Sequence, residues 1–198
     1  MTPAQINPLI NHIRSRGVAL HDTGIETIQH LFRHKKFRKN QYILQTGEIA
    51  RYETFVIRGL LRTYLVDDKG QEHVIQFSAE DWWAGDLFSF FSEKPTSYNI
   101  DCLETSEVLQ ITKDDLEKLQ LTIPAINHYL QLLYRNATIA LNQRIASSLC
   151  NTATERYLDF LERYPAIQQR VPDHQIASYL GITPPSLSRI RRQFFKSK

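Results

Sequence analysis

The chain has 198 residues, 42% of them hydrophobic, and its formal net charge at pH 7 is only +3. This length allows one or two domains with a sizeable core, and the small charge excludes a protein that is cationic over its whole surface. There is neither a signal segment nor a long apolar run, so we expect a cytoplasmic protein with no membrane partner. The two cysteines are far apart and lack metal-ligand spacing, so we expect free thiols, no metal and no cofactor.

The first part of the chain predicts two kinds of structure. Residues 6–32 alternate apolar and polar side chains at helical spacing, which predicts one or two short helices. Six short segments rich in β-branched and aromatic residues then follow, separated by turn signals such as Gly47 and Pro95. They are Gln41–Leu44, Thr54–Ile57, Leu60–Val66, His73–Phe77, Tyr98–Leu103 and Glu107–Ile111. Many short strands at this spacing predict an antiparallel double-sheet body such as a jelly roll.

Helical periodicity returns after Thr112. One helix is predicted from Asp114, and a long one from Pro124 to about Asn151. The long helix carries an apolar seam at steps of four and three residues, formed by Ile126, Leu130, Leu133, Ala137 and Ala140. Such a seam is typical of a helix that pairs with its copy in a homodimer, although packing on the chain's own β-body explains it nearly as well. A further helix is predicted over Thr154–Tyr164.

The segment from Val171 to Phe195 reads as a helix-turn-helix. Asp173 is the expected N-cap of a short amphipathic helix, which Gly181 ends with a left-handed backbone. Thr183 then caps a second helix, whose first turn tolerates Pro184 and Pro185 because it needs no backbone donors. The second helix would be the DNA-reading element.

The charges of this second helix point to double-stranded DNA as the partner. No Asp or Glu follows Asp173, whereas five Arg and Lys residues do. The buried side is expected to carry Leu187, Ile190 and Phe194. The expected DNA-binding residues are Thr183, Ser186, Ser188, Arg189, Arg191, Arg192 and Lys196. The alternative is a solvent-exposed terminal helix with no partner. That alternative does not explain why the cap, the glycine turn and the arginines on one side occur together.

The order of these elements resembles the Crp/Fnr family of bacterial transcription regulators over nearly the whole chain. The residues that carry the resemblance are Gly47-Glu48, Phe55–Gly59, Asp67–Gly70, Gly85-Asp86-Leu87, Ile176-Ala177, Gly181-Ile182-Thr183 and Ser188-Arg189-Ile190. The resemblance implies an α+β chain with a cyclic-nucleotide-binding-like β-roll sensor over residues 1–115. A dimerisation helix would cover 116–151 and a helix-turn-helix domain 152–198. It also implies that Arg189 hydrogen-bonds a guanine, and it makes RNA polymerase a candidate partner.

The sequence departs from the members of this family that bind cyclic AMP. In those members a Gly-Glu-Leu segment holds the ribose, and an arginine about ten residues later pairs with the cyclic phosphate. Here Thr96 stands in the place of that arginine, so we expect a small effector other than cyclic AMP. The residues expected to form its pocket are Gly85, Asp86, Leu87, Thr96, Ser97, Leu141 and Asn142. The nearby aromatic run from Trp82 to Phe91 is either β-roll core or the lining of an apolar effector pocket.

Two alternatives remain beside an effector-controlled regulator. The first is a dimeric DNA-binding protein without any effector, whose β-roll only supports dimerisation. The second is a β-roll protein that binds a small molecule, or a cupin-like enzyme, which would need clustered His and carboxylate ligands inside the barrel. Between Phe37 and Ile111 the sequence has one histidine, His73, so we expect no enzyme activity.

Overall fold

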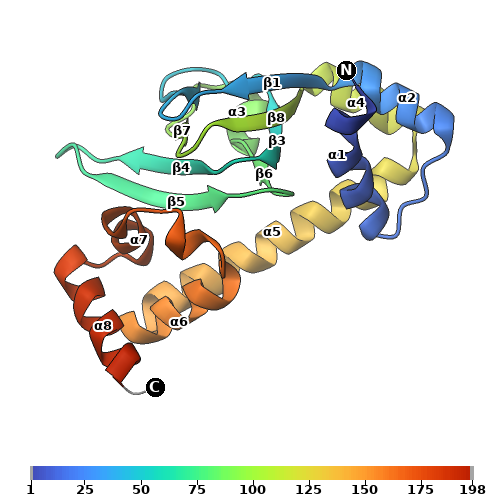
Figure 1. The fold of residues 1–198 in the computed structure, drawn as a ribbon. Helices are drawn as coiled ribbons and strands as arrows, with labels where there is room; N and C mark the ends of the chain where they lie inside the picture. The colour runs from blue at the N-terminus through green and yellow to red at the C-terminus, as the bar shows by residue number, and fades with distance from the viewer. Residues whose placement is uncertain (1, 197–198) are drawn as a thin grey trace. The chain divides into compact units, whose positions relative to one another are not determined.

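The computed structural model describes the backbone of residues 2–196 and the side chains of residues 2–193. It contains α-helices and antiparallel strands, as expected of an α+β chain (Figure 1). In the part of the chain that the structure describes, no helix combines the length and the apolar character needed to cross a membrane.

The chain forms two compact units. Unit 1 comprises Met1–Thr63 and Phe77–Arg135, and unit 2 comprises Tyr64–Gln76 and Asn136–Lys198. The sequence-based segments 1–115, 116–151 and 152–198 are contiguous, whereas each unit takes residues from two stretches. The difference arises because the β-hairpin of residues 64–76 groups with the C-terminal helices, which no local pattern in the sequence reveals.

Unit 1 holds four helices, most of the sheet structure and the first part of a long helix. The helices are α1 (Pro3–Ser15), α2 (Asp22–Leu31), α3 (Leu87–Ser92), α4 (Lys113–Thr122) and the start of α5 (Ala125–Cys150). The strands of the chain are β1 (Arg33–Phe37), β2 (Tyr42–Leu44), β3 (Glu53–Arg58), β4 (Leu61–Val66), β5 (Glu72–Ser78), β6 (Trp83–Ala84), β7 (Asn99–Cys102) and β8 (Ser106–Ile111). All six predicted strands are present, and none of their ends is shifted by more than one residue.

Two four-stranded sheets form the β-roll, with strand orders β1-β8-β3-β6 and β2-β7-β4-β5. In the first sheet, β8 pairs antiparallel with β1 and with β3, so that Val108 lies opposite both Lys35 and Val56. Strand β1 was not predicted, because its sequence Arg-His-Lys-Lys-Phe lacks an apolar alternation. It is held by pairing with β8 and by ion pairs of Lys36 and His34 with Glu107, at 2.8 and 3.1 Å.

The core of unit 1 joins the helices to the sheets. It includes Ile6 and Ile13 of α1, Phe55 of β3 and Leu109 of β8, all essentially inaccessible to solvent. Within it the hydroxyl of Tyr129 on α5 accepts the indole N–H of Trp83 at 2.9 Å. This core fixes β3, β6 and the start of α5 as one rigid body.

Unit 2 is built from the later helices and the hairpin between β4 and β5. Its helices are the end of α5, α6 (Ala153–Arg163), the 3-10 turn η1 (Ile167–Gln169), α7 (Asp173–Leu180) and α8 (Pro184–Lys196). Thr152 caps α6 and forms a capping box with Glu155. The core of the unit contains mutually contacting rings of Phe160, Tyr164 and Tyr179, with centroids 5.3 to 5.7 Å apart.

Candidate nucleic-acid interface and effector pocket

Helices α7 and α8 form the predicted helix-turn-helix. Gly181 has φ +66°, and the N–H of Ile182 donates to the carbonyl of Ala177 at 3.0 Å, which closes the helix end. A side chain at Gly181 would meet open space, so glycine is required by its backbone angle and not by crowding. The N-cap of α7 is Pro172 and Asp173 is the first helical residue, so the helix begins one residue earlier than predicted.

Helix α8 begins as the sequence predicts. Pro184 is its first residue, and Thr183 Oγ1 accepts the backbone N–H of Ser186 at 3.4 Å. The same hydroxyl lies 2.9 Å from that of Ser186, so both side chains are engaged in the cap. Because Pro184 and Pro185 have no N–H and the N–H of Ser186 is capped, the helix start has few free donors for a phosphate.

The two faces of α8 differ in burial. Leu187 and Ile190 are buried in the unit, whereas Ser188, Arg189 and Arg192 are exposed. Three of the predicted DNA-binding residues therefore share a solvent-facing side of the helix. The side chains of Phe194 and Lys196 lie outside the described residues.

Arg191, one of the predicted DNA-binding residues, is only partly exposed and is hydrogen-bonded within unit 2. Its Nε donates to the hydroxyl of Tyr157 at 3.1 Å, and its Nη1 pairs with the carboxylate of Asp173 at 2.5 Å. The reason is its position four residues after Leu187, which places it on the buried side of the helix. Arg191 therefore ties α8 to α6 and α7.

In unit 1, the acidic residue of the predicted effector pocket is engaged by its own chain. Asp86 caps α3 by accepting the N–H groups of Phe88 and Ser89, at 3.0 and 3.3 Å. Its other carboxylate oxygen accepts the hydroxyl of Thr96 at 2.6 Å, and both side chains are buried. Asp86 and Thr96 thus satisfy each other within the chain.

The other predicted pocket residues differ in burial and belong to both units. Leu87 and Ser97 are exposed in unit 1, and Leu141 and Asn142 are exposed in unit 2. Of the predicted residues, only Gly85 lines the pocket of about 490 Å³ found in unit 1. No local pattern predicts this lining, because it combines distant segments: the loop at residues 47–52 with Thr54, Ala84, Ile100 and Gln110.

A buried carboxyl group beside Gly85 also escaped sequence reasoning. Glu53 is 7% exposed, and a Cβ placed on Gly85 would lie 2.2 Å from its Oε1, so any side chain at position 85 would require the Glu53 carboxyl to move. Burial, followed by the nearby Asp86 carboxylate, raises the pKa of Glu53 to about 8. Glu53 was not predicted to be buried, because a charged residue at the start of a strand is usually exposed to solvent. The residue that covers it, Gly85, is also distant in the sequence.

The predicted aromatic cluster divides between core and surface. Phe90 is buried and Trp83 packs against the core, which fits the first interpretation. Trp82, Phe88 and Phe91 are instead partly or largely exposed, so they line no enclosed cavity.

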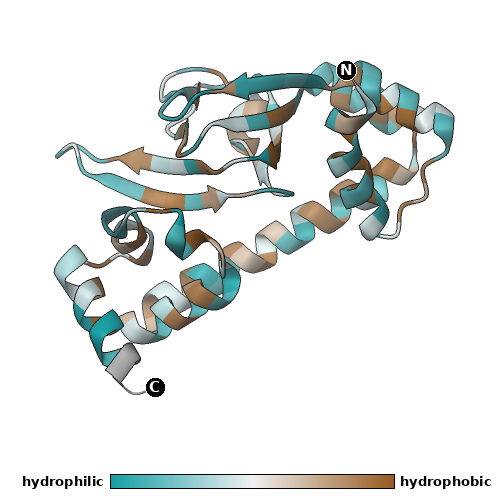
Figure 2. Cartoon of the chain, in the orientation of Figure 1, coloured by the Kyte–Doolittle hydropathy of each residue, from teal (hydrophilic) through white to brown (hydrophobic). Residues whose placement is uncertain are grey.

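The predicted dimer seam on α5 is only partly available to another chain. Ile126 and Leu130 are buried in the core of unit 1, and Leu133 packs against that core. This corrects the expectation that all five seam residues face a partner, since helical periodicity does not distinguish the chain's own core from a second copy. Farther along, Figure 2 shows hydrophobic residues continuing toward the end of α5, where Leu141, Ile145 and Leu149 are 56%, 49% and 79% exposed.

Comparisons with known proteins agree with this fold. Residues 34–122 match the family model of the cyclic nucleotide-binding domain. The chain is similar to the regulatory protein HlyX of Actinobacillus pleuropneumoniae, with 27% identity over 179 residues that cover 83% of this chain and 72% of that protein. Among solved structures it is similar to CLP, described as a c-di-GMP-responsive global regulator of Xanthomonas campestris, with a TM-score of 0.72, 14% identity and coverage of 89% and 93%. FixK2 of Bradyrhizobium japonicum gives a TM-score of 0.70, 20% identity and coverage of 84% and 85%.

Proposed function

Because this chain belongs to the Crp/Fnr family of transcription regulators, we propose that it binds duplex DNA as a homodimer in the cytoplasm, with α8 as the helix that reads the sequence. The observation that carries the proposal is the division of α8 into a buried face and an exposed face that presents Arg189 and Arg192. Such a helix fits the major groove with its polar side toward the base edges. RNA polymerase remains a candidate partner, as the family resemblance implies.

Within this face we assign different tasks to the two arginines. The guanidinium of Arg189 matches the paired acceptors of a guanine, which is the commonest base contact of arginine. Arg192, nearer the helix end, is assigned to phosphate. The helix start contributes little to phosphate binding, because Pro184 and Pro185 offer no N–H. Side chains must therefore supply most of the electrostatic attraction.

A binding experiment tests this assignment. The preferred site is selected from random duplexes, and the affinity of each variant is measured by fluorescence anisotropy on that site and on a scrambled duplex. Arg189→Ala should lose about 1–3 kcal/mol on the selected site and much less on the scrambled one. Arg192→Ala should weaken both and reduce the slope of log affinity against log salt by about one. Equal losses from Arg189→Ala on both duplexes would show that it contacts phosphate.

The dimer is proposed to form through the exposed part of α5. Leu141, Ile145 and Leu149 recur every four residues and leave a continuous apolar strip on this helix. Pairing two copies of such a strip places two reading helices about a two-fold axis, as a palindromic site with half-sites roughly 34 Å apart requires.

We infer that the β-roll does not respond to cyclic AMP. A cyclic phosphate needs a charged partner, and the buried hydroxyl of Thr96 is already bonded to Asp86. The pocket of about 490 Å³ combines apolar walls with the polar residues Tyr52, Thr54 and Gln110 and the charged residues Glu48 and Arg51, which favours a small effector that has both apolar and polar groups. Such an effector would act by shifting the population of the DNA-binding conformation. A thermal-shift screen of metabolites and cyclic nucleotides distinguishes this from a regulator that has no effector.

The curated relatives to which the chain is similar are transcriptional regulators and not enzymes. The cupin-like alternative is therefore set aside. Whether the protein activates or represses its genes depends on where its site lies relative to the promoter.

A further inference from the structure

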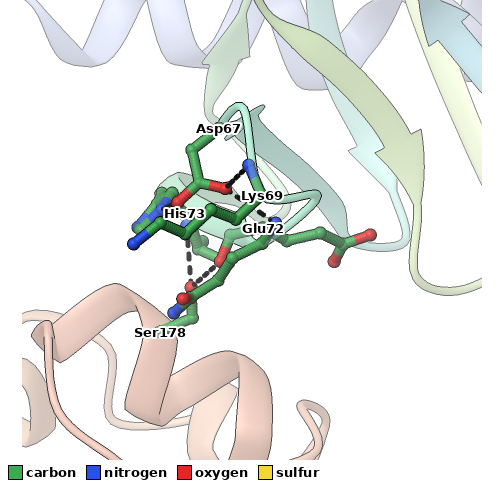
Figure 3. Close-up of polar contacts among 7 residues, drawn as sticks. Asp67, Lys69, Glu72, His73 and Ser178 are labelled. Atoms are coloured by element: carbon green, nitrogen blue, oxygen red, sulfur yellow. Dashed lines mark hydrogen bonds and ion pairs between the residues drawn. The ribbon is translucent and has the colours of Figure 1, made fainter.

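Strand β5 lies at the edge of its sheet, and α7 covers part of that edge. An edge strand carries backbone N–H and C=O groups without a neighbouring strand. The hydroxyl of Ser178 on α7 donates to the carbonyl of Glu72 at 2.7 Å and accepts the N–H of Val74 at 3.0 Å (Figure 3). A single side chain thus satisfies two adjacent groups of the edge, as a further strand would.

Arg144 on α5 strengthens the same contact. Its guanidinium donates to the carbonyls of Val74 at 3.0 Å and Tyr179 at 3.2 Å, and also to that of Ile75. The group also lies over the ring of Tyr179, 4.2 Å from its centroid. Tyr179 is in the last turn of α7, where carbonyls have no partner within the helix and favour a cation. Arg144 therefore joins β5 to the end of α7.

The hairpin that presents β5 is braced at its tip. Asp67 accepts the N–H groups of Lys69 and Gln71, each at 2.9 Å, and pairs with His73 at 2.8 Å (Figure 3). Side-chain bonds of this kind hold a turn in one conformation. The surface that receives Ser178 is consequently ordered by its own hydrogen bonds.

We propose that Ser178 and Arg144 are positioning residues for DNA recognition, because they fix α7 on the edge of β5 and thereby fix the start of α8. Only residues 181–183 separate the two helices, and Gly181 and Thr183 hold this turn in a capped conformation. A displacement of α7 is therefore passed on to the exposed face of α8. This assignment rests on the proposed function of α8 as the reading helix.

Three serine variants of the full chain test the proposal. Ser178→Ala removes both hydrogen bonds to β5, whereas Ser178→Thr keeps a hydroxyl. Ser148→Ala is the matched control, because it removes a hydrogen bond from a serine hydroxyl to a backbone carbonyl on a different helix, α5. Hydrogen exchange of the Val74 amide measures the contact without DNA. Anisotropy on the selected duplex and on a scrambled duplex measures recognition.

Ser178→Ala should speed exchange of the Val74 amide and raise the Kd for the selected duplex about tenfold, as expected if the binding-competent fraction falls to about a tenth. Binding to the scrambled duplex should not change, since Arg189 and Arg192 remain. Ser178→Thr and Ser148→Ala should behave like the parent, and Arg144→Ala should behave like Ser178→Ala.

Two results would overturn the proposal. The first is unchanged exchange at Val74 in Ser178→Ala, which would mean that the contact does not protect the edge. The second is faster exchange with no loss of affinity for the selected duplex, which would mean that the contact has no part in recognition. Failure of the proposed function is distinct, because the parent itself would then show no preference for any duplex while Val74 still reported on the contact.

Discussion

Replacing Glu53 with glutamine should change how the stability of the protein depends on pH. Glu53 is buried beside Gly85 and Asp86, and within the described part of the chain its Oε1 has no hydrogen-bond partner. Burial raises its pKa from an ordinary value of 4.5 to about 8. At neutral pH the folded protein therefore holds a proton that the unfolded chain has released.

The sign and size of the effect follow from this difference. Because the folded state binds more protons, the free energy of unfolding falls as pH rises from the unfolded pKa of 4.5 to the folded pKa of about 8, and it levels off above. Each pH unit in this range costs about 1.4 kcal/mol, so the accumulated cost at pH 7 is about 3 kcal/mol. Glutamine is similar in size but does not titrate. In Glu53→Gln, position 53 should therefore contribute no fall in the free energy of unfolding as the pH rises from 4.5 to about 8.

Urea unfolding between about pH 5 and pH 8 measures the effect. Both tryptophans of the chain, Trp82 and Trp83, lie in unit 1, so their fluorescence follows the unit that contains Glu53. The parent and Glu53→Gln should be similar at the acidic end, and the variant should be more stable by several kcal/mol at the alkaline end. Glu26→Gln, at an exposed position of α2, is the matched control and should follow the parent. Parallel pH profiles of parent and Glu53→Gln would refute the reasoning.

Three further outcomes are expected. Leu141→Glu should convert a dimer to a monomer in sedimentation, whereas the exposed Gln131→Glu on the same helix should not; a fully dimeric Leu141→Glu would exclude this interface. Tyr157→Phe, which removes the hydroxyl bonded to Arg191, should lower the stability of unit 2 by about 1 kcal/mol, and an unchanged thermal midpoint would count against that bond. Isothermal titration of cyclic AMP should give a Kd weaker than about 10 μM, and tighter binding would mean that some group replaces the arginine missing at Thr96.

The sequence predicts well those features that depend on residues close together in the chain. The helix-turn-helix was predicted within one residue, because the caps and the positive φ of Gly181 are local requirements. The six strands with β-branched and aromatic residues were predicted for the same reason. Strand β1 and the two-residue strand β6 were missed, because pairing with a distant strand and not their own composition makes them strands.

Features that depend on distant partners were predicted less well. The arginines of α8 look alike in the sequence, but Arg191 meets Asp173 and Tyr157, which are 18 and 34 residues away. Likewise, the periodicity of α5 shows which face is apolar, while only the fold shows that Ile126 and Leu130 contact the chain's own core. The mutual hydrogen bond of Asp86 and Thr96 was not foreseen either, although the absence of an arginine at position 96 already argued against cyclic AMP.

Unit 2 is built from two separate segments of the chain, which limits how this protein can be combined with its relatives in a chimera. The chain passes between the units inside β4, inside β5 and inside α5, and never through a flexible linker. A chimera that exchanges only residues 136–198 would separate Ser178 from the backbone groups of Glu72 and Val74 to which it is hydrogen-bonded. Grafting a new DNA specificity onto this β-roll therefore requires either exchange of the hairpin at 64–76 as well or retention of the native α7 surface with substitutions confined to the exposed face of α8.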